Sequence, residues 1–258
     1  MIDRVDLNSD LGESWGAYTI GEDQQMLSIV TSANIACGFH GGDSDVMSET
    51  VRFAKSKGVA VGAHPSYLDL WGFGRRRIVG DTPAELERTI VYQIGALKGI
   101  AAMHGHPVTH VKAHGSLGNV SAENLEVATA IARGIKAADP ELIYIVMPGR
   151  ETERAGQDVG LRLAREVYAD RTYEDDGNLT PRAKDGAVIH DAELACARVL
   201  EMLERGAITS RTGARVDVAI DTICVHGDNP AGVAMAQQIR DAIVAAGVAI
   251  EPFHTFVD

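Results

Sequence analysis

The sequence predicts an α/β protein with a single domain, residues 1–258, folded as a seven-stranded parallel β/α barrel. Short apolar runs rich in β-branched residues alternate with longer amphipathic runs, which is the pattern of parallel strands joined by helices. Seven of these short runs occur, and no linker or low-complexity tract separates them. Chains of this length often form one barrel domain, so a closed barrel is favoured over an open doubly wound sheet.

The expected elements follow from these patterns and from local start and stop signals. Strands are expected at residues 5–8, 33–37, 60–63, 110–113, 143–147, 166–168 and 222–225, with a weaker run at 249–252 as a closing strand or a tail. Helices are expected at residues 43–57, 82–104, 122–138, 151–163, 191–204 and 232–246. Thr82 and Pro83 are typical of a helix start, and Gly58 and Gly247 of helix ends.

The charge balance and the cysteines exclude several classes of protein. With 36 acidic and 24 basic residues, the formal net charge of −12 disfavours nucleic acid and anionic membrane surfaces as partners. The charged N-terminal residues do not resemble a signal peptide, and no apolar run approaches the length of a membrane span, so we expect a cytoplasmic protein. Cys37, Cys196 and Cys224 form no CxxC pair and are expected to be free thiols.

Polar side chains gather where the expected strands end. Asp6, Asn8 and Asp10 alternate along the first strand and therefore share one face. Later strands end in Asn34, His40, Asp43, His64, Lys112, His114, Asp170, Arg171, His226 and Asp228. Because the loops after the strands of a parallel barrel converge at one end, these residues predict a functional site there.

The histidines divide into two groups. A single histidine at a strand end is usually a hydrogen-bonded core or loop residue. Burying several titratable groups together is costly unless they pair or bind a ligand, so the set His40, His64, His114 and His226 indicates a site. The remaining histidines are interpreted as structural: His104, His106, His110, His190 and His254.

Two further features leave alternatives open. Arg75, Arg76 and Arg77 follow two glycines; they are either a solvated charge run or part of a loop that closes over a carboxylate or phosphate. Asp10, His64 and His114 are candidate ligands for zinc or a similar divalent metal, although the spacings HExxH and HxH are missing. The GxxxxGK[ST] phosphate loop is missing too. We expect Asp6 and Asp10 to offset the charge of Lys112 and His114.

Seven ordered motifs resemble one family. They are DLNSDLGE, NIACGFHGGD, GAHPSY, GFGRR, KAHGSL, ADRTYEDDGNLTPR and VHGDNP, and as a set they resemble the LamB/YcsF family, the A subunits of bacterial ATP-dependent 5-oxoprolinase. The resemblance implies a barrel related to the glycoside hydrolase/deacetylase group. It also implies ring opening of 5-oxo-L-proline to L-glutamate, coupled to ATP hydrolysis, with companion subunits B and C.

The motifs of the family carry over these positions as site residues: Asp10, Glu13, His40, Asp43, His64, Lys112, His114, His226 and Asp228. From the chemistry of lactam hydrolysis we expect Asp10 to act as general base and His64 and His114 to transfer protons, and Lys112, with Arg75 and Arg76, to neutralise phosphate or carboxylate charge. Substrate or phosphate binding falls to Asn8, Glu13, His40, Asp43, Arg75, Arg76, Asp170, His226 and Asp228. ATP is the co-substrate, bound on this chain or on a companion subunit. Residues 68–71, Leu-Asp-Leu-Trp, depart from the family pattern before the arginine loop.

Two rival functions remain at this point. One is a metal-dependent amide or carbohydrate deacetylase, because related barrels use strand-end Asp and His as metal ligands. The other is a non-catalytic subunit that binds the substrate or organises its partners.

Overall fold

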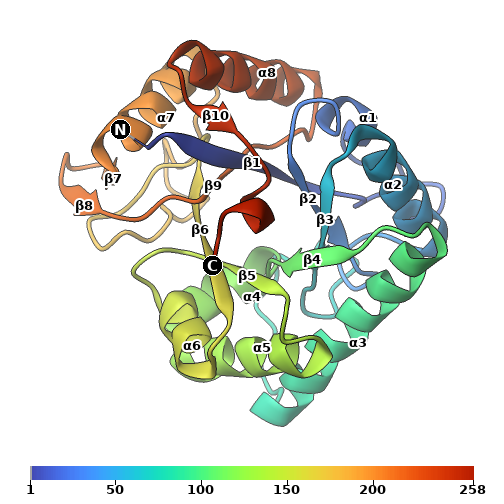
Figure 1. Ribbon diagram of the computed structural model, residues 1–258. Coiled ribbons are helices and arrows are strands. Elements are labelled where there is room, and N and C mark those ends of the chain that lie inside the picture. The colour runs from blue at the N-terminus through green and yellow to red at the C-terminus, as the bar shows by residue number, and fades with distance from the viewer. Residues whose placement is uncertain (1) are drawn as a thin grey trace.

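A computed structural model describes residues 2–258 and shows a closed barrel of seven parallel strands (Figure 1). The strands are β1 (Arg4–Leu11), β2 (Ser32–Ala36), β3 (Ala60–His64), β4 (Val108–Val111), β5 (Ile143–Val146), β6 (Arg162–Tyr168) and β9 (Thr222–Cys224). Closure depends on β9, in which Thr222 is paired with Asp6 of β1 on one side and with Glu166 of β6 on the other. The predicted seven-stranded β/α barrel is confirmed.

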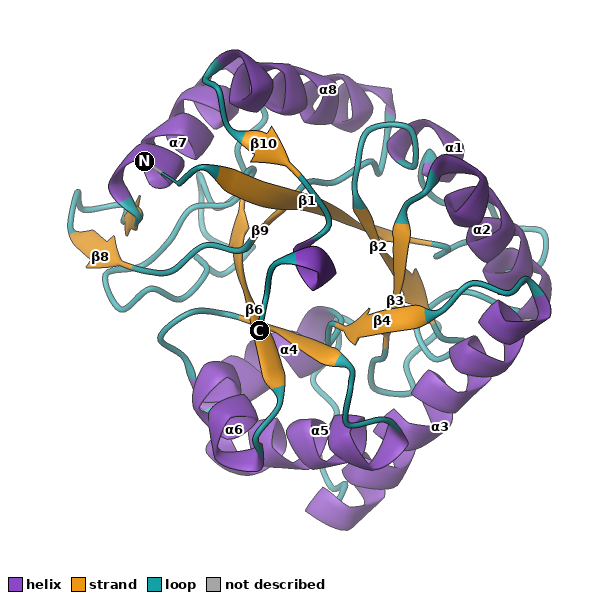
Figure 2. Cartoon of the chain, viewed as in Figure 1, coloured by secondary structure: helices purple, strands orange, loops and turns teal. Residues whose placement is uncertain are grey.

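Helices surround the barrel on its outer side (Figure 2). They are α1 (Asp23–Met26), α2 (Ser44–Lys57), α3 (Pro83–Met103), α4 (Gly115–Glu123), α5 (Leu125–Ala138), α6 (Glu151–Val159), α7 (Ala192–Arg205) and α8 (Pro230–Ala245). The predicted start of α3 is correct: Thr82 and Glu85 form a reciprocal capping box. Outward-facing strand residues pack with the inner faces of these helices into one continuous core, which includes Ile35, Ile90 and Ile131.

The C-terminal segment closes one end of the barrel. β10 (Ala249–Ile250) pairs with the start of β1, and the 3₁₀ helix η1 (Phe253–Thr255) lies within the ring of strands in Figure 1. Phe253 is fully buried and packs against Ile143 and Ala164, which lie near the starts of their strands. The weak eighth run is therefore a strand outside the closed ring, and the open end of the barrel is the one where the strands finish.

Several element boundaries differ from the prediction because backbone signals outweigh amphipathic patterns. The helix expected at 151–163 ends at Val159, since Gly160 has a φ of 74° and β6 begins at Arg162. The helix expected at 122–138 is divided at Asn124, whose extended backbone ends α4 and whose side chain caps α5.

Other elements were not expected. α1 is a short helix, most of α4 precedes the helix expected at 122–138, and β7 (Ala207–Thr209) pairs antiparallel with β8 (Arg215–Asp217) in a hairpin outside the barrel. The three cysteines are free thiols, with Cys37 and Cys224 buried. No helix within residues 2–258 has the length and apolar character that crossing a membrane requires.

Candidate active site

A cavity of about 520 Å³ opens where the barrel strands end. The residues in its wall that lie in the strands or just after them include Asp10, His64, Lys112, Glu166, Tyr168 and His226. Ser116 of α4 and several loop residues complete it, among them Arg75, Asn178, Thr180, Arg171 and Arg182. A cavity of this size is typical of small-molecule sites and is much larger than one five-membered ring.

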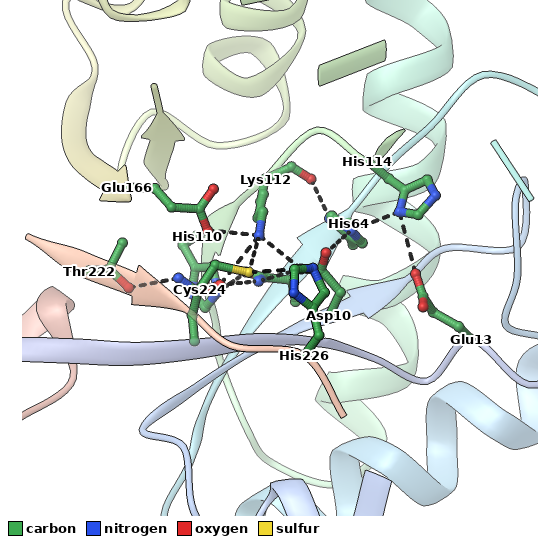
Figure 3. Close-up of polar contacts among 12 residues, drawn as sticks. Asp10, Glu13, His64, His110, Lys112, His114, Glu166, Thr222, Cys224 and His226 are labelled. Carbon is green, nitrogen blue, oxygen red and sulfur yellow. Dashed lines mark hydrogen bonds and ion pairs between the residues drawn. The ribbon is translucent and has the colours of Figure 1, made fainter. Parts of the chain in front are cut away.

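Lys112 is buried between two carboxylates (Figure 3). Its Nζ lies 2.7 Å from Glu166 Oε1 and 3.0 Å from Asp10 Oδ1. Burial opposes the charged ammonium, but Asp10, Cys224 and Glu166 outweigh it and raise the pKa of Lys112 well above its usual value. Lys112 therefore carries a permanent positive charge in the cavity wall.

The prediction that Asp6 offsets the charge of Lys112 is wrong, because Asp6 lies deeper in the barrel. Its carboxylate accepts hydrogen bonds from the hydroxyl groups of Thr31, Ser32 and Thr222. Asn8 lies one layer above and is also fully buried: its Nδ2 donates to Thr222 Oγ1 at 2.7 Å, and its Oδ1 accepts from Asn34. Through these hydrogen bonds, Asn8 holds in place the layer of buried polar side chains directly below the cavity.

Asp10 uses both carboxylate oxygens. Oδ1 accepts from Lys112 and from Asn34 Nδ2 at 2.9 Å, and Oδ2 lies 3.2 Å from His64 Nε2. Burial favours the neutral acid, but the contacts with His64 and Lys112 outweigh it and hold the pKa of Asp10 well below its usual range. Asp10 is consequently ionised and engaged on both sides.

A cluster of three histidines and Glu13 lies beside Asp10. His64 Nε2 and His114 Nδ1 are 3.0 Å apart, and Glu13 Oε1 lies 3.3 Å from His114 Nδ1 and 2.9 Å from His40 Nε2. The rings of His40 and His114 stack with centroids 3.6 Å apart. Burial is the main reason that the pKa values of His40 and His114 are well below normal, which keeps both rings neutral.

This cluster fits a divalent metal ion. His64 Nδ1 lies 2.8 Å from the Lys112 carbonyl oxygen and His114 Nε2 lies 2.8 Å from that of Phe73, so both N–H groups donate to backbone. The facing nitrogens, His64 Nε2 and His114 Nδ1, therefore both present lone pairs. The two imidazoles belong to a group with Glu13 and His40 whose ligand atoms all lie within 4.8 Å of one another, and this donor set matches that of zinc and related ions. Asp10 lies in a second such group, with Cys224 and His226.

A pair of interacting side chains, His226 and Asp170, lies on the other side of Lys112. His226 Nδ1 is 2.8 Å from Asp170 Oδ2, and Cys224 Sγ is 3.2 Å from Lys112 Nζ. Burial opposes protonation of His226, but Cys224 and Asp170 together raise its pKa well above the usual value. The cavity wall thus holds a protonated imidazole held by a carboxylate.

The comparisons with known proteins decide the family. The profile of the LamB/YcsF family matches residues 5–258. The chain belongs to the LamB/YcsF family. It is 52% identical over 250 residues to the 5-oxoprolinase A subunit of Rhodopseudomonas palustris strain BisB5, covering 97% of this chain and 98% of that one. It is 50% identical over 251 residues to the 5-oxoprolinase A subunit of Nitrobacter hamburgensis, with coverage of 97% and 98%.

Solved structures agree with this assignment. The lactam utilization protein from Thermus thermophilus superimposes on this LamB/YcsF protein with a TM-score of 0.91 and 43% identity, covering 96% of this chain and 99% of that one. The catalytic domain of a peptidoglycan N-acetylglucosamine deacetylase from Eubacterium rectale gives a TM-score of 0.50 at 12% identity, with coverage of 97% and 88%. This second likeness shows that the two share a fold.

The loop that carries Arg75, Arg76 and Arg77 in this LamB/YcsF protein is held together by an aspartate of the same loop, Asp69. Asp69 is 2% exposed and accepts hydrogen bonds from the backbone of Gly72 and from the Arg76 guanidinium. The structure therefore places Arg76 in the loop itself and not among the residues that line the cavity, which corrects its predicted role. Arg75 does line the cavity, with its guanidinium 5.1 Å from the Phe73 ring centroid.

Two predicted site residues lie outside the polar cluster. Asp43 caps α2, accepting from the backbone of Asp45 and Val46, and also accepts from Gly16. Asp228 is exposed and has no hydrogen bond or ion pair within residues 2–258. Helix capping thus explains Asp43, and Asp228 contributes only charge near the site.

Sequence reasoning missed Glu166, Tyr168 and Cys224. Glu166 and Tyr168 alternate with Asp170 along β6, so the same two-residue period that grouped Asp6, Asn8 and Asp10 was available to find them. His110 belongs to β4 and is fully buried, with Nε2 3.1 Å from Asn34 Oδ1. It lies in the strand expected at residues 110–113, and its burial agrees with the structural role expected for it.

Proposed function

We propose that this LamB/YcsF protein opens the lactam ring of 5-oxo-L-proline to L-glutamate, as the A subunit of an ATP-dependent 5-oxoprolinase. The observation that carries the proposal is the buried Lys112 ammonium in the cavity wall, between Asp10 and Glu166 and next to His64 and His226. The names of the relatives, which denote the A subunit of 5-oxoprolinase and a lactam utilization protein, support the same reaction.

A lactam is a stable amide and a poor electrophile, so the site must stabilise negative charge on its carbonyl oxygen. Lys112 supplies a fixed positive charge with its ion-pair partners already in place, so no reorganisation is needed during the reaction. We therefore place the amide oxygen against Lys112 and the ring in the cavity above β1 and β4.

Water activation falls to the Asp10–His64 pair. Asp10 alone is a weak base because its pKa is held low. His64 Nε2 carries a lone pair toward the cavity wall, and the imidazolium that forms when it accepts a proton donates to Asp10 Oδ2, 3.2 Å away. The general-base role expected for Asp10 is thus shared with His64.

The departing ring nitrogen needs a proton. His226 lines the cavity and is protonated, with Asp170 holding its other ring nitrogen. His226 is therefore the proposed acid for carbon–nitrogen cleavage, and Asp170 positions it.

ATP enters the proposal as the co-substrate that activates the amide. Transfer of its terminal phosphoryl group to the amide oxygen gives ADP and an imidate-like phosphate. Water then adds to this carbon, the carbon–nitrogen bond of the tetrahedral adduct breaks as the nitrogen takes up a proton, and γ-glutamyl phosphate forms. A second water hydrolyses this acyl phosphate to glutamate and phosphate. The relatives are named as subunits, which supports companion chains, and subunits B and C complete the proposed complex.

A divalent metal also has a place in the proposal. Glu13, His40, His64 and His114 would hold it, because their ligand atoms all lie within 4.8 Å of one another. When bound, it supplies Lewis-acid polarisation of water or of the substrate carbonyl. His64 Nε2 would then be occupied as a ligand, so the proton-accepting role proposed for His64 applies to the metal-free site. The same cluster favours a second candidate, a metal-dependent amide deacetylase, which would work without ATP.

Glutamate release from 5-oxo-L-proline tests the proposal, with ADP followed in parallel. The purified chain is assayed alone, with its B and C subunits, and with or without zinc. Release that needs the mixture and ATP is the expected result. Hydrolysis of acetylated amides by the chain alone, stimulated by zinc and indifferent to ATP, would replace the proposal with the deacetylase.

A further inference from the structure

Arg171 is a buried cation that forms no ion pair within residues 2–258, although the charge of Asp170, the preceding residue, acts on it. It lies just after β6, is 6% exposed and lines the cavity. Within residues 2–258, no carboxylate lies within ion-pair distance of its guanidinium, and its hydrogen-bond acceptors are the carbonyl oxygens of Ala187 and Thr180. Burying an arginine with neutral partners alone is unfavourable, so a bound anion would balance its charge.

The loop after β6 holds this guanidinium in a fixed position. Nη2 donates to Thr180 O at 2.7 Å and Nε donates to Ala187 O at 3.3 Å, while Nη1 has no hydrogen bond to residues 2–258. Backbone bridges join Arg171 to Val188 and Tyr173 to Leu179 across the same loop. The free N–H groups of Arg171 are therefore preorganised to receive a planar anion.

A second guanidinium reinforces the positive charge. Arg182 lines the same cavity, is exposed, and has no hydrogen bond or ion pair within residues 2–258. Burial first, and the neighbouring Arg182 charge second, lower the pKa of Arg171. Two mutually repelling arginines at one cavity in a chain of net charge −12 indicate selection for an anionic ligand.

We propose that Arg171, assisted by Arg182, binds the ring carboxylate of the lactam substrate. This inference rests on the proposed function, because 5-oxo-L-proline carries one carboxylate on the carbon next to its amide nitrogen. With the amide oxygen at Lys112, we place the carboxylate at the arginines, which line the same cavity. The pair selects cyclic amides that carry a carboxylate against neutral lactams.

The test compares Arg171→Gln and Arg182→Gln with the matched control Arg133→Gln, which changes an exposed arginine on α5. In the assembled complex, Arg171→Gln is expected to lower kcat/KM for 5-oxo-L-proline about 100-fold and Arg182→Gln about 10-fold. Arg133→Gln is expected to leave kcat/KM for 5-oxo-L-proline unchanged, and the KM for ATP is expected to be the same in all three variants. Thermal melting checks that each variant is folded, and Arg182→Gln keeps the test valid should Arg171→Gln unfold.

Calorimetric binding to the chain separates this inference from the proposed function. We expect 5-oxo-L-proline to bind the wild-type chain and to lose affinity in both cavity variants, even where the complex shows no turnover. The neutral lactam 2-pyrrolidinone should bind all four proteins equally weakly. Unchanged affinity for 5-oxo-L-proline in both cavity variants would overturn the inference, as would a selective loss of ATP or inorganic phosphate binding, which would assign the arginines to phosphate.

Discussion

At the scale of single residues, the site is organised around the Lys112 ammonium. Buried ion pairs contribute little net stability, because desolvation offsets the attraction between the charges. What the contacts with Asp10 and Glu166 provide is orientation: they fix the ammonium at a definite place in the cavity wall. Removing one partner is costly, since an unpaired buried charge remains.

Lys112→Met tests this directly. It leaves two buried carboxylates facing each other without a cation, so we expect the free energy of unfolding to fall by about 3 to 5 kcal/mol and activity to disappear. Adding Glu166→Gln removes one of these charges and should recover part of the stability but none of the activity. Urea denaturation of the wild type and of the single and double variants measures the free energy of unfolding, and glutamate release measures the activity. Equal stability of wild type and Lys112→Met would contradict the account.

Asp6 gives the chain a pH-dependent stability. Burial raises the pKa of Asp6 from its ordinary value of 3.8 to about 6, so the folded protein prefers the protonated acid. Its contribution to stability is therefore largest below about pH 4 and is lost as the pH rises to about 6. The loss is at most about 3 kcal/mol.

The comparison with Asp6→Asn isolates this effect from other titrating groups. We expect the stability of wild type relative to Asp6→Asn to fall between pH 4 and pH 6 and to be constant above that range. Chemical denaturation at a series of pH values provides the measurement. If the stability of wild type relative to Asp6→Asn rose between pH 4 and pH 6, Asp6 would be ionised more easily in the folded than in the unfolded protein, which would contradict the prediction.

At the scale of elements, the loop closed by Asp69 and Arg76 packs directly on the histidines. Gly74 in this loop has a φ of 64°, and a Cβ there would lie 2.6 Å from His114 Cδ2 and 2.9 Å from His40 Cβ. The sequence marked this loop as glycine-flexed, but only the structure shows that a glycine is needed for close contact with the site.

Gly74→Ala should therefore lower activity at least 10-fold by displacing the His40–His114 stack. Gly58→Ala is the matched control, because Gly58 has a similar φ of 70° and no atom within 4 Å of its Cβ position. Both variants should lose about 1 kcal/mol from backbone strain. Equal activity of the two would show that the loop does not hold the histidines in place.

The sequence predicted the elements better than the contacts. Strand ends were found because their polar residues interrupt apolar runs, and this placed Asp10, His64 and Lys112 together. Glu166, the second partner of Lys112, was missed because β4 and β6 are not neighbours in the sheet, and no local pattern reports which side chains meet inside the closed barrel. The end of α6 was misplaced because the amphipathic pattern continues past Gly160 into the first residues of β6.

At the scale of the whole molecule, the two ends of the barrel have different tasks. The C-terminal segment fills the end where strands begin, with Phe253 fully buried there, and the cavity occupies the opposite end. The buried polar layers of Asp6, Asn8 and Asp10 connect the two ends along β1. Binding at the cavity should therefore stabilise the entire fold.

Metal binding tests that coupling without any activity assay. Zinc at about 100 times its dissociation constant should stabilise the chain by about 3 kcal/mol and raise its Tm. His64→Ala should abolish the increase, whereas His190→Ala, on the exposed surface, should retain it. An identical Tm increase in both variants would place the metal elsewhere.

The most direct test of the central claim is glutamate release by the assembled complex when only this chain is altered. With subunits B and C and ATP held constant, Asp10→Asn should reduce turnover at least 100-fold, because it disrupts both Lys112 and His64. Asp43→Asn, which changes a helix cap outside the cluster, should leave turnover nearly unchanged. Full turnover with Asp10→Asn would contradict the claim that the lactam is opened in this barrel.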